Sequence, residues 1–194
     1  MKINIIFCLT LLILFSCKVE RNNNCHILLL RAKENLNIYY EKKDTNYLRV
    51  AKECLDSITC VSYEKRIFNT KTTILLLLKN YKEGVKYISS LDSTFFERSY
   101  MKSMYLNRFK ALERESMLDT IHRNQYYNEG LCAIFSYMNK HPTDKETLVE
   151  YYFFKILFND HTEVVKEVEA LKKQKIFETD FLDALIETLN ELNK

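Results

Sequence analysis

The side chains best suited to acid–base or metal chemistry are four histidines, which stand apart in the sequence. Histidine works as a general base or metal ligand only when a nucleophile, a carboxylate or a second ligand lies beside it. No Walker loop, HExxH or GxSxG motif accompanies them. We therefore predict a non-enzyme without catalytic residue, metal site or cofactor. The histidines with expected structural roles are His26, His122, His141 and His161.

The cysteines in the body of the chain form no CxxC pair of the kind that holds zinc or performs redox chemistry. We expect Cys25 and Cys132 to be core residues. Cys54 and Cys60 are the nearest pair in sequence, and a disulfide between them requires a helix to end near Thr59. Whether these two are bridged stays open at this stage.

Charged side chains alternate in sign along the chain, which has a formal net charge of +3. Carboxylate pairs such as Glu113 with Glu115 lie in stretches where Lys and Glu solvate a helix. This pattern disfavours both general acid–base catalysis and a nucleic-acid partner.

The elements that must position these side chains are predicted to be helices. The 194 residues contain two glycines and one proline, too few for the turns of a sheet or for a phosphate-binding loop. Apolar residues recur at helical spacing from Cys25 onward. We predict an all-α fold with helices near 24–42, 45–59, 63–78, 81–92, 96–116, 120–140, 144–158, 161–174 and 179–192.

Two pairs of similar segments indicate an internal repeat. Residues 54–57 (CLDS) and 90–93 (SLDS) lie 36 positions apart, and residues 128–131 and 162–165 lie 34 apart. Residues 79–87, with Gly84 where a small side chain lets helices approach, resemble the turn and second-helix opening of the tetratricopeptide repeat. The resemblance covers most of residues 27–173.

Membership of this family implies a right-handed solenoid of about four helical hairpins with the last helix as a cap, built from residues 25–194. An irregular helical bundle that imitates the period is the alternative. In such solenoids the first helix of each hairpin lines a concave groove. The residues that the repeat assigns to this groove are Lys33, Asn37, Tyr40, Arg66, Asn69, Thr73, Val149, Phe153 and Ile156.

The tract at residues 151–154 is aromatic on all sides of its predicted helix. It is either buried by both neighbouring helices or partly exposed as a binding patch. We expect burial.

The first residues read as a secretion signal, with Lys2 before an apolar stretch of about 13 residues, shorter than a spanning helix needs. Leu14-Phe15-Ser16-Cys17 resembles the lipobox of bacterial lipoproteins. The resemblance implies cleavage of residues 1–16, lipidation of Cys17 and a short tether over 17–24. A plain apolar signal region that happens to contain Cys17 is the alternative.

Together these resemblances imply a lipoprotein anchored in the cell envelope, at the outer membrane, whose helical-repeat groove binds a protein or peptide. The alternative is a periplasmic immunity lipoprotein that neutralises a cognate toxin. The first function predicts a multi-protein complex, and the second predicts one tight partner.

Overall fold

The computed structural model describes residues 24–192, which fold into helices and connecting turns without a strand. The prediction of an all-α fold is confirmed in this part of the chain. Two compact units divide between Asn80 and Tyr81, and each is described by itself. The predicted signal peptide, Cys17 and the tether up to residue 23 lie outside the described residues.

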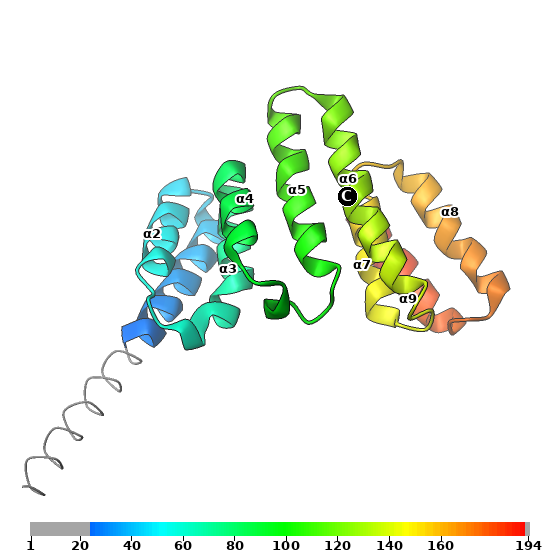
Figure 1. Ribbon diagram of the computed structural model, residues 1–194, viewed down its shortest axis with the longest axis horizontal. Coiled ribbons are helices and arrows are strands. Elements are labelled where there is room, and N and C mark those ends of the chain that lie inside the picture. Colours follow the sequence, from blue (N-terminus) through cyan, green and yellow to red (C-terminus); the bar gives the residue numbers. More distant parts are fainter. Residues whose placement is uncertain (1–23, 193–194) are drawn as a thin grey trace, which may run out of the picture. The chain divides into compact units, whose positions relative to one another are not determined.

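Unit 1 contains a helix at residues 24–42, α2 (Thr45–Asp56), the 3-10 turn η1 (Val61–Tyr63) and α3 (Glu64–Leu77), as Figure 1 shows. Their apolar faces form one core, in which Ala32, Leu48, Ala51 and Ile74 are fully buried. Burial of such side chains supplies most of the stability of short helices, which are marginal alone.

A disulfide between Cys25 and Cys60 closes this unit, with Cα atoms 6.4 Å apart. A bridge between Cys54 and Cys60, which the sequence left open, is therefore excluded in this structure. Because α2 ends at Asp56, the chain leaves the helix before Cys60 and carries it to the first described turn of the helix at 24–42. Cys54 stays a buried free thiol in the core.

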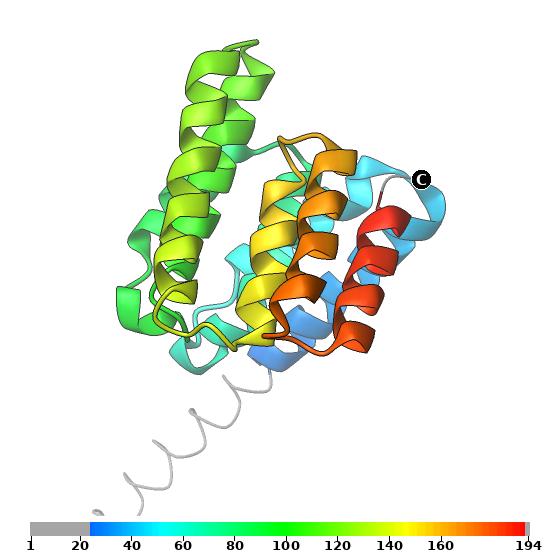
Figure 2. The same cartoon turned by 90° about the vertical axis from the view of Figure 1, so that its right-hand side faces the viewer.

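Unit 2 contains eight helical segments over residues 81–192. They are α4 (Tyr81–Ser90), η2 (Ser93–Phe95), α5 (Met101–Ser116), α6 (Thr120–Met138), α7 (Lys145–Lys155), α8 (His161–Leu171) with η3 (Lys172–Gln174), and α9 (Thr179–Glu191). Helices α5 and α6 form a long antiparallel hairpin (Figure 1), and α7, α8 and α9 lie side by side (Figure 2). The apolar stripe of α9 buries Leu182, Leu185 and Leu189 against α7 and α8.

Four α-helices in the described part of the chain start with the same device, an aspartate whose side chain accepts a hydrogen bond from a backbone N–H of the first turn. This N-cap satisfies a donor that the helix itself leaves free. The aspartates are Asp44 before α2, Asp119 before α6, Asp144 before α7 and Asp160 before α8. One start differs from the prediction, because Asp92 caps η2 and α5 begins only at Met101 rather than near residue 96.

Four helical segments are followed by a residue that takes the left-handed backbone conformation although it is not glycine. Lys43, Lys79, Leu118 and Lys175 have φ values of 56 to 60°. After Lys79, the Asn80 N–H donates to the Leu75 carbonyl, and after Leu118 the Asp119 N–H donates to that of Arg114, as in a Schellman motif. Both glycines instead lie inside helices, at close contacts with aromatic rings.

At Gly84 the neighbouring ring is that of Phe109, and at Gly130 it is that of Phe154. A Cβ atom at Gly84 would stand 2.2 Å from Phe109 Cδ1, and one at Gly130 would stand 2.6 Å from Phe154 Cζ. The sequence assigned Gly84 to a close helix approach, and here it lets α4 contact α5.

Cys132 was expected in the core but is exposed on α6. Gly130 and Ile134, four residues apart, are the buried positions of this stretch. Cys132 lies midway between them in sequence, which places it on the opposite side of the helix.

Candidate functional site

A pocket of about 750 Å³ lies in unit 2, beside the turn that joins α7 to α8. Its lining comes from α5, the end of α7, the turn that follows, the start of α8 and the residue after α9. The lining residues are Arg108, Phe153, Ile156, Leu157, Asn159, Asp160, His161, Thr162 and Leu192. The pocket is the strongest candidate for a binding site in the described part of the chain.

The apolar wall of the pocket is formed by Phe153, Ile156, Leu157 and Leu192. Phe153 and Ile156 are half-buried and pack against the core shared by α7, α8 and α9. Leu157 and Leu192 remain 41% and 59% exposed. The wall thus combines side chains fixed by packing with side chains that offer apolar area to a ligand.

The polar side chains of the turn are held by the backbone around them. Asp160 accepts from the Glu163 N–H at 3.1 Å, and the Asn159 amide donates to the Lys155 carbonyl at 3.0 Å. His161 Nε2 lies 3.1 Å from the Leu189 carbonyl. A carbonyl can only accept, so Nε2 carries the proton, and the imidazole joins the start of α8 to the end of α9.

Arg108 differs from these residues because its Nε is buried without a hydrogen-bond partner among the described residues. A buried N–H normally has an acceptor, so this guanidinium is unusual. Burial raises the pKa of the Tyr105 and Tyr127 phenols, and the positive charge of Arg108 lowers both pKa values by a smaller amount.

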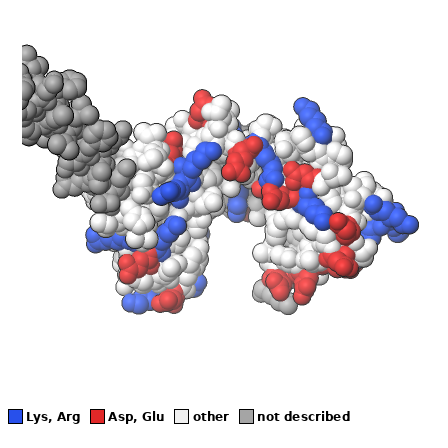
Figure 3. All heavy atoms as spheres, turned by 90° about the horizontal axis from the view of Figure 1, so that it is seen from below, with Lys and Arg blue, Asp and Glu red and all other residues white. Residues whose placement is uncertain are grey.

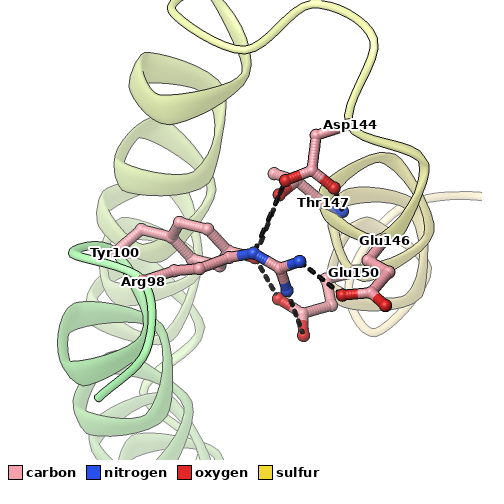
Figure 4. A network of polar contacts seen from close by, with 6 residues as sticks. All are labelled: Arg98, Tyr100, Asp144, Glu146, Thr147 and Glu150. Atoms are coloured by element: carbon pink, nitrogen blue, oxygen red, sulfur yellow. Dashed lines mark hydrogen bonds and ion pairs between the residues drawn. The ribbon is translucent and has the colours of Figure 1, made fainter. Parts of the chain in front are cut away.

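A second polar cluster joins the segment before α5 to the start of α7 (Figure 4). Arg98 pairs with Glu146 and with Asp144, the latter at 3.5 Å from Nε, and lies 4.0 Å from Glu150. Tyr100 is 2% exposed and donates to Glu150. Every group in this cluster has a partner, which indicates a structural connection rather than an open site.

The pKa values in this cluster follow from its contacts. Burial, together with the hydrogen bond to Glu150, raises the pKa of Tyr100 well above its ordinary value. Burial alone would raise the pKa of Asp144, but hydrogen bonds from Thr147 and the charge of Arg98 lower it overall. Tyr100 therefore stays a donor and Asp144 an acceptor near neutral pH.

The groove residues predicted in unit 1 lie at the surface. Lys33, Asn37 and Tyr40 are exposed on the helix at 24–42. On α3, Arg66 and Asn69 are exposed and Thr73 is partly exposed. Lys43 Nζ lies 5.6 Å from the Tyr40 ring centroid, and the Arg66 guanidinium lies 5.1 Å from that of Tyr63.

The three groove residues predicted in unit 2 have different surroundings. Phe153 and Ile156 line the pocket, whereas Val149 packs against the core. The sequence did not identify Arg108 as a site residue. The third repeat is longer than the others, so the repeat pattern could not show which residues of α5 face the groove. Of the aromatic tract, Tyr152 and Phe154 are buried and Tyr151 and Phe153 are half-buried, so burial predominates as expected.

The four histidines lie apart in their units as they do in the sequence. His122 Nδ1 lies 2.8 Å from Asp119, His141 stacks on Tyr137, and His26 is exposed. Within residues 24–192, no group of three or more His, Cys, Asp or Glu side chains is placed to hold a metal ion.

Positive and negative side chains are interspersed on the face shown in Figure 3. No helix in the described part of the chain is long and apolar enough to cross a membrane. Comparisons with protein-family models, with curated proteins and with solved structures found no match to this chain.

Proposed function

We propose that this protein is a lipid-anchored scaffold of the bacterial cell envelope whose helical repeats bind a protein or peptide segment. The observation that carries the binding role is the pocket beside the α7–α8 turn. Phe153 and Ile156, which the repeat pattern assigned to the binding surface, both line it. Apolar side chains at the mouth of a depression are typical anchoring points for a partner.

The proposed architecture is a right-handed solenoid of tetratricopeptide-like hairpins. It is supported by the helix lengths, by short turns between successive helices and by the close contacts at Gly84 and Gly130. Repeat proteins of this kind present extended concave surfaces to their partners.

Export from the cytoplasm is supported by the disulfide between Cys25 and Cys60. Disulfides persist in oxidising compartments such as the periplasm and are rare where thiols are kept reduced. The lipobox-like segment at residues 14–17 also supports export, and the proposed destination of the lipid-anchored protein is the outer membrane.

The binding role can be tested by cross-linking in intact cells followed by capture of the tagged protein from the membrane fraction. We expect a set of partners that is lost when Phe153 and Ile156 are both replaced by alanine. A second variant, with Tyr40→Ala and Arg66→Ala, tests the predicted surface of unit 1.

The matched control replaces Leu118 and Ile121 by alanine, since these apolar side chains are 90% and 79% exposed but lie outside the pocket. It should retain all partners. Unchanged partners in both test variants would contradict the binding assignment. A single tight partner encoded beside this protein would instead favour the toxin-neutralising role.

A further inference from the structure

The pocket beside the α7–α8 turn has features that a protein-binding surface does not require. We infer that it binds a small carboxylate carrying an apolar body, such as an aryl or alkyl acid. This goes beyond the proposed scaffold role and does not depend on it. Three observations carry the inference: the unpartnered Arg108, the apolar wall and the size of the pocket.

Arg108 supplies the recognition of charge. Its Nε is buried and has no acceptor among residues 24–192, and its side chain lines the pocket. A guanidinium fork matches a carboxylate, which can accept from two of its N–H groups at once. Nε itself is closed to solvent, so a carboxylate bound in the pocket would accept from the other N–H groups of this partly exposed guanidinium.

The apolar wall supplies the second part of the recognition. Phe153 and Ile156 are held by the core of α7, α8 and α9, so the surface they offer is already formed. A volume of about 750 Å³ falls within the range typical of small-molecule sites. Its lining combines four apolar side chains with five polar or charged ones, and polar groups in such sites orient the ligand.

Asp160 also lines the pocket and would repel an anion placed beside it. Its side chain is already engaged, because it accepts the Glu163 N–H at the start of α8. The helix start also offsets its negative charge. His161 is likewise occupied by the Leu189 carbonyl. Among the lining residues, Arg108 thus remains the charged group with an unfilled donor.

The test compares 3-phenylpropionate with its uncharged amide, which has nearly the same shape. The purified full chain is the sample, and binding is titrated by saturation-transfer NMR with each compound in buffer alone as the blank. We expect the acid to bind at least tenfold more tightly than the amide. This comparison needs no variant and cannot be confused with misfolding.

Variants then assign the selectivity to residues. Arg108→Gln should give the acid and the amide equal affinities, whereas Phe153→Ala should weaken both to a similar extent. Arg114→Gln is the matched control, because Arg114 lies on the same helix outside the pocket and pairs with Asp119 at 3.7 Å. It should leave both affinities unchanged, and thermal unfolding verifies that each variant is folded.

Three results would overturn the inference: neither compound binds, both bind wild-type protein equally, or folded Arg108→Gln still prefers the acid. None of them bears on the scaffold role, which is measured by the partners captured from cells.

Discussion

The ring of Phe109 occupies the space that any side chain at Gly84 would need. Phe109 is fully buried, so its ring cannot swing into solvent. Alanine normally favours a helix over glycine by about 1 kcal/mol, but here the added methyl group must displace a packed ring.

We predict that Gly84→Ala lowers the free energy of unfolding by about 1–3 kcal/mol, the usual effect of overpacking a core. Urea denaturation followed by circular dichroism measures it. Ser89→Ala, at an exposed position of α4, is the control and should change little. Adding Phe109→Leu to Gly84→Ala should restore part of the loss, and no restoration would argue against the ring contact as the cause.

Tyr127 gives the protein a pH dependence that can be tested in alkaline solution. Burial and the nearby Glu115 carboxylate raise its pKa to about 12, whereas a tyrosine in an unfolded chain ionises near pH 10. Between these values the unfolded chain has lost a proton that the folded chain keeps. The contribution of Tyr127 to the free energy of unfolding is therefore constant below about pH 10 and falls as the pH rises toward 12.

We predict that Tyr127→Phe reduces this alkaline loss, which for one group is at most about 1.4 kcal/mol per pH unit. Urea denaturation at several values between pH 9 and 12 gives the slopes. Leu118→Ala, which removes an exposed side chain without a titratable group, should keep the wild-type slope. Identical slopes for Tyr127→Phe and the wild type would show that the alkaline loss of stability comes from groups other than Tyr127.

At the scale of helices, much of the fold can be read from the sequence. Starts are recognisable because an aspartate precedes the apolar pattern, as Asp144 does before α7. Ends are harder to read, because the apolar pattern continues into the turn. The predicted ends of α2, α7 and α8 lie three residues too late, whereas those of α3 and α5 are correct to within one residue.

Contacts between distant residues are what the sequence does not reveal. Cys25 and Cys60 are 35 residues apart and meet only once two helices have packed. Arg108 reaches the pocket from α5, whereas most other lining residues come from the region of the α7–α8 turn. Their proximity depends on helix packing, which periodicity within one helix does not specify.

The disulfide gives a prediction at this same scale. A bridge closing a loop of 35 residues stabilises a fold by about 3–4 kcal/mol, mainly by restricting the unfolded chain. Replacing Cys25 and Cys60 together by serine should lower the stability of unit 1 by about this amount. Hydrogen exchange read by mass spectrometry resolves the two units.

The exposed thiol Cys132 provides the control, since Cys132→Ser should leave exchange in both units unchanged. Equal loss of protection in units 1 and 2 after removal of the bridge would contradict its local role.

For the whole molecule, the proposed attachment to the membrane is the property with the largest consequence. Cys17→Ser removes the proposed lipid site, and several acyl chains together hold a protein on a bilayer almost permanently. We predict that the variant moves from the membrane fraction to the soluble fraction while its circular dichroism spectrum stays unchanged. Continued membrane retention would contradict the anchor. Ser16→Ala, which keeps a small residue before Cys17, is the control.

The Cys25–Cys60 bond also determines how the chain responds to being pulled. Tension applied ahead of Cys25 passes through the two sulfur atoms to Cys60 and bypasses the residues between them. Those residues would otherwise extend by up to about 120 Å. A protein tethered at its amino-terminal end would therefore transmit mechanical force to α3 while the helix at 24–42 and α2 stay folded. After reduction of the bond, the same force would unfold and extend the residues between the two cysteines.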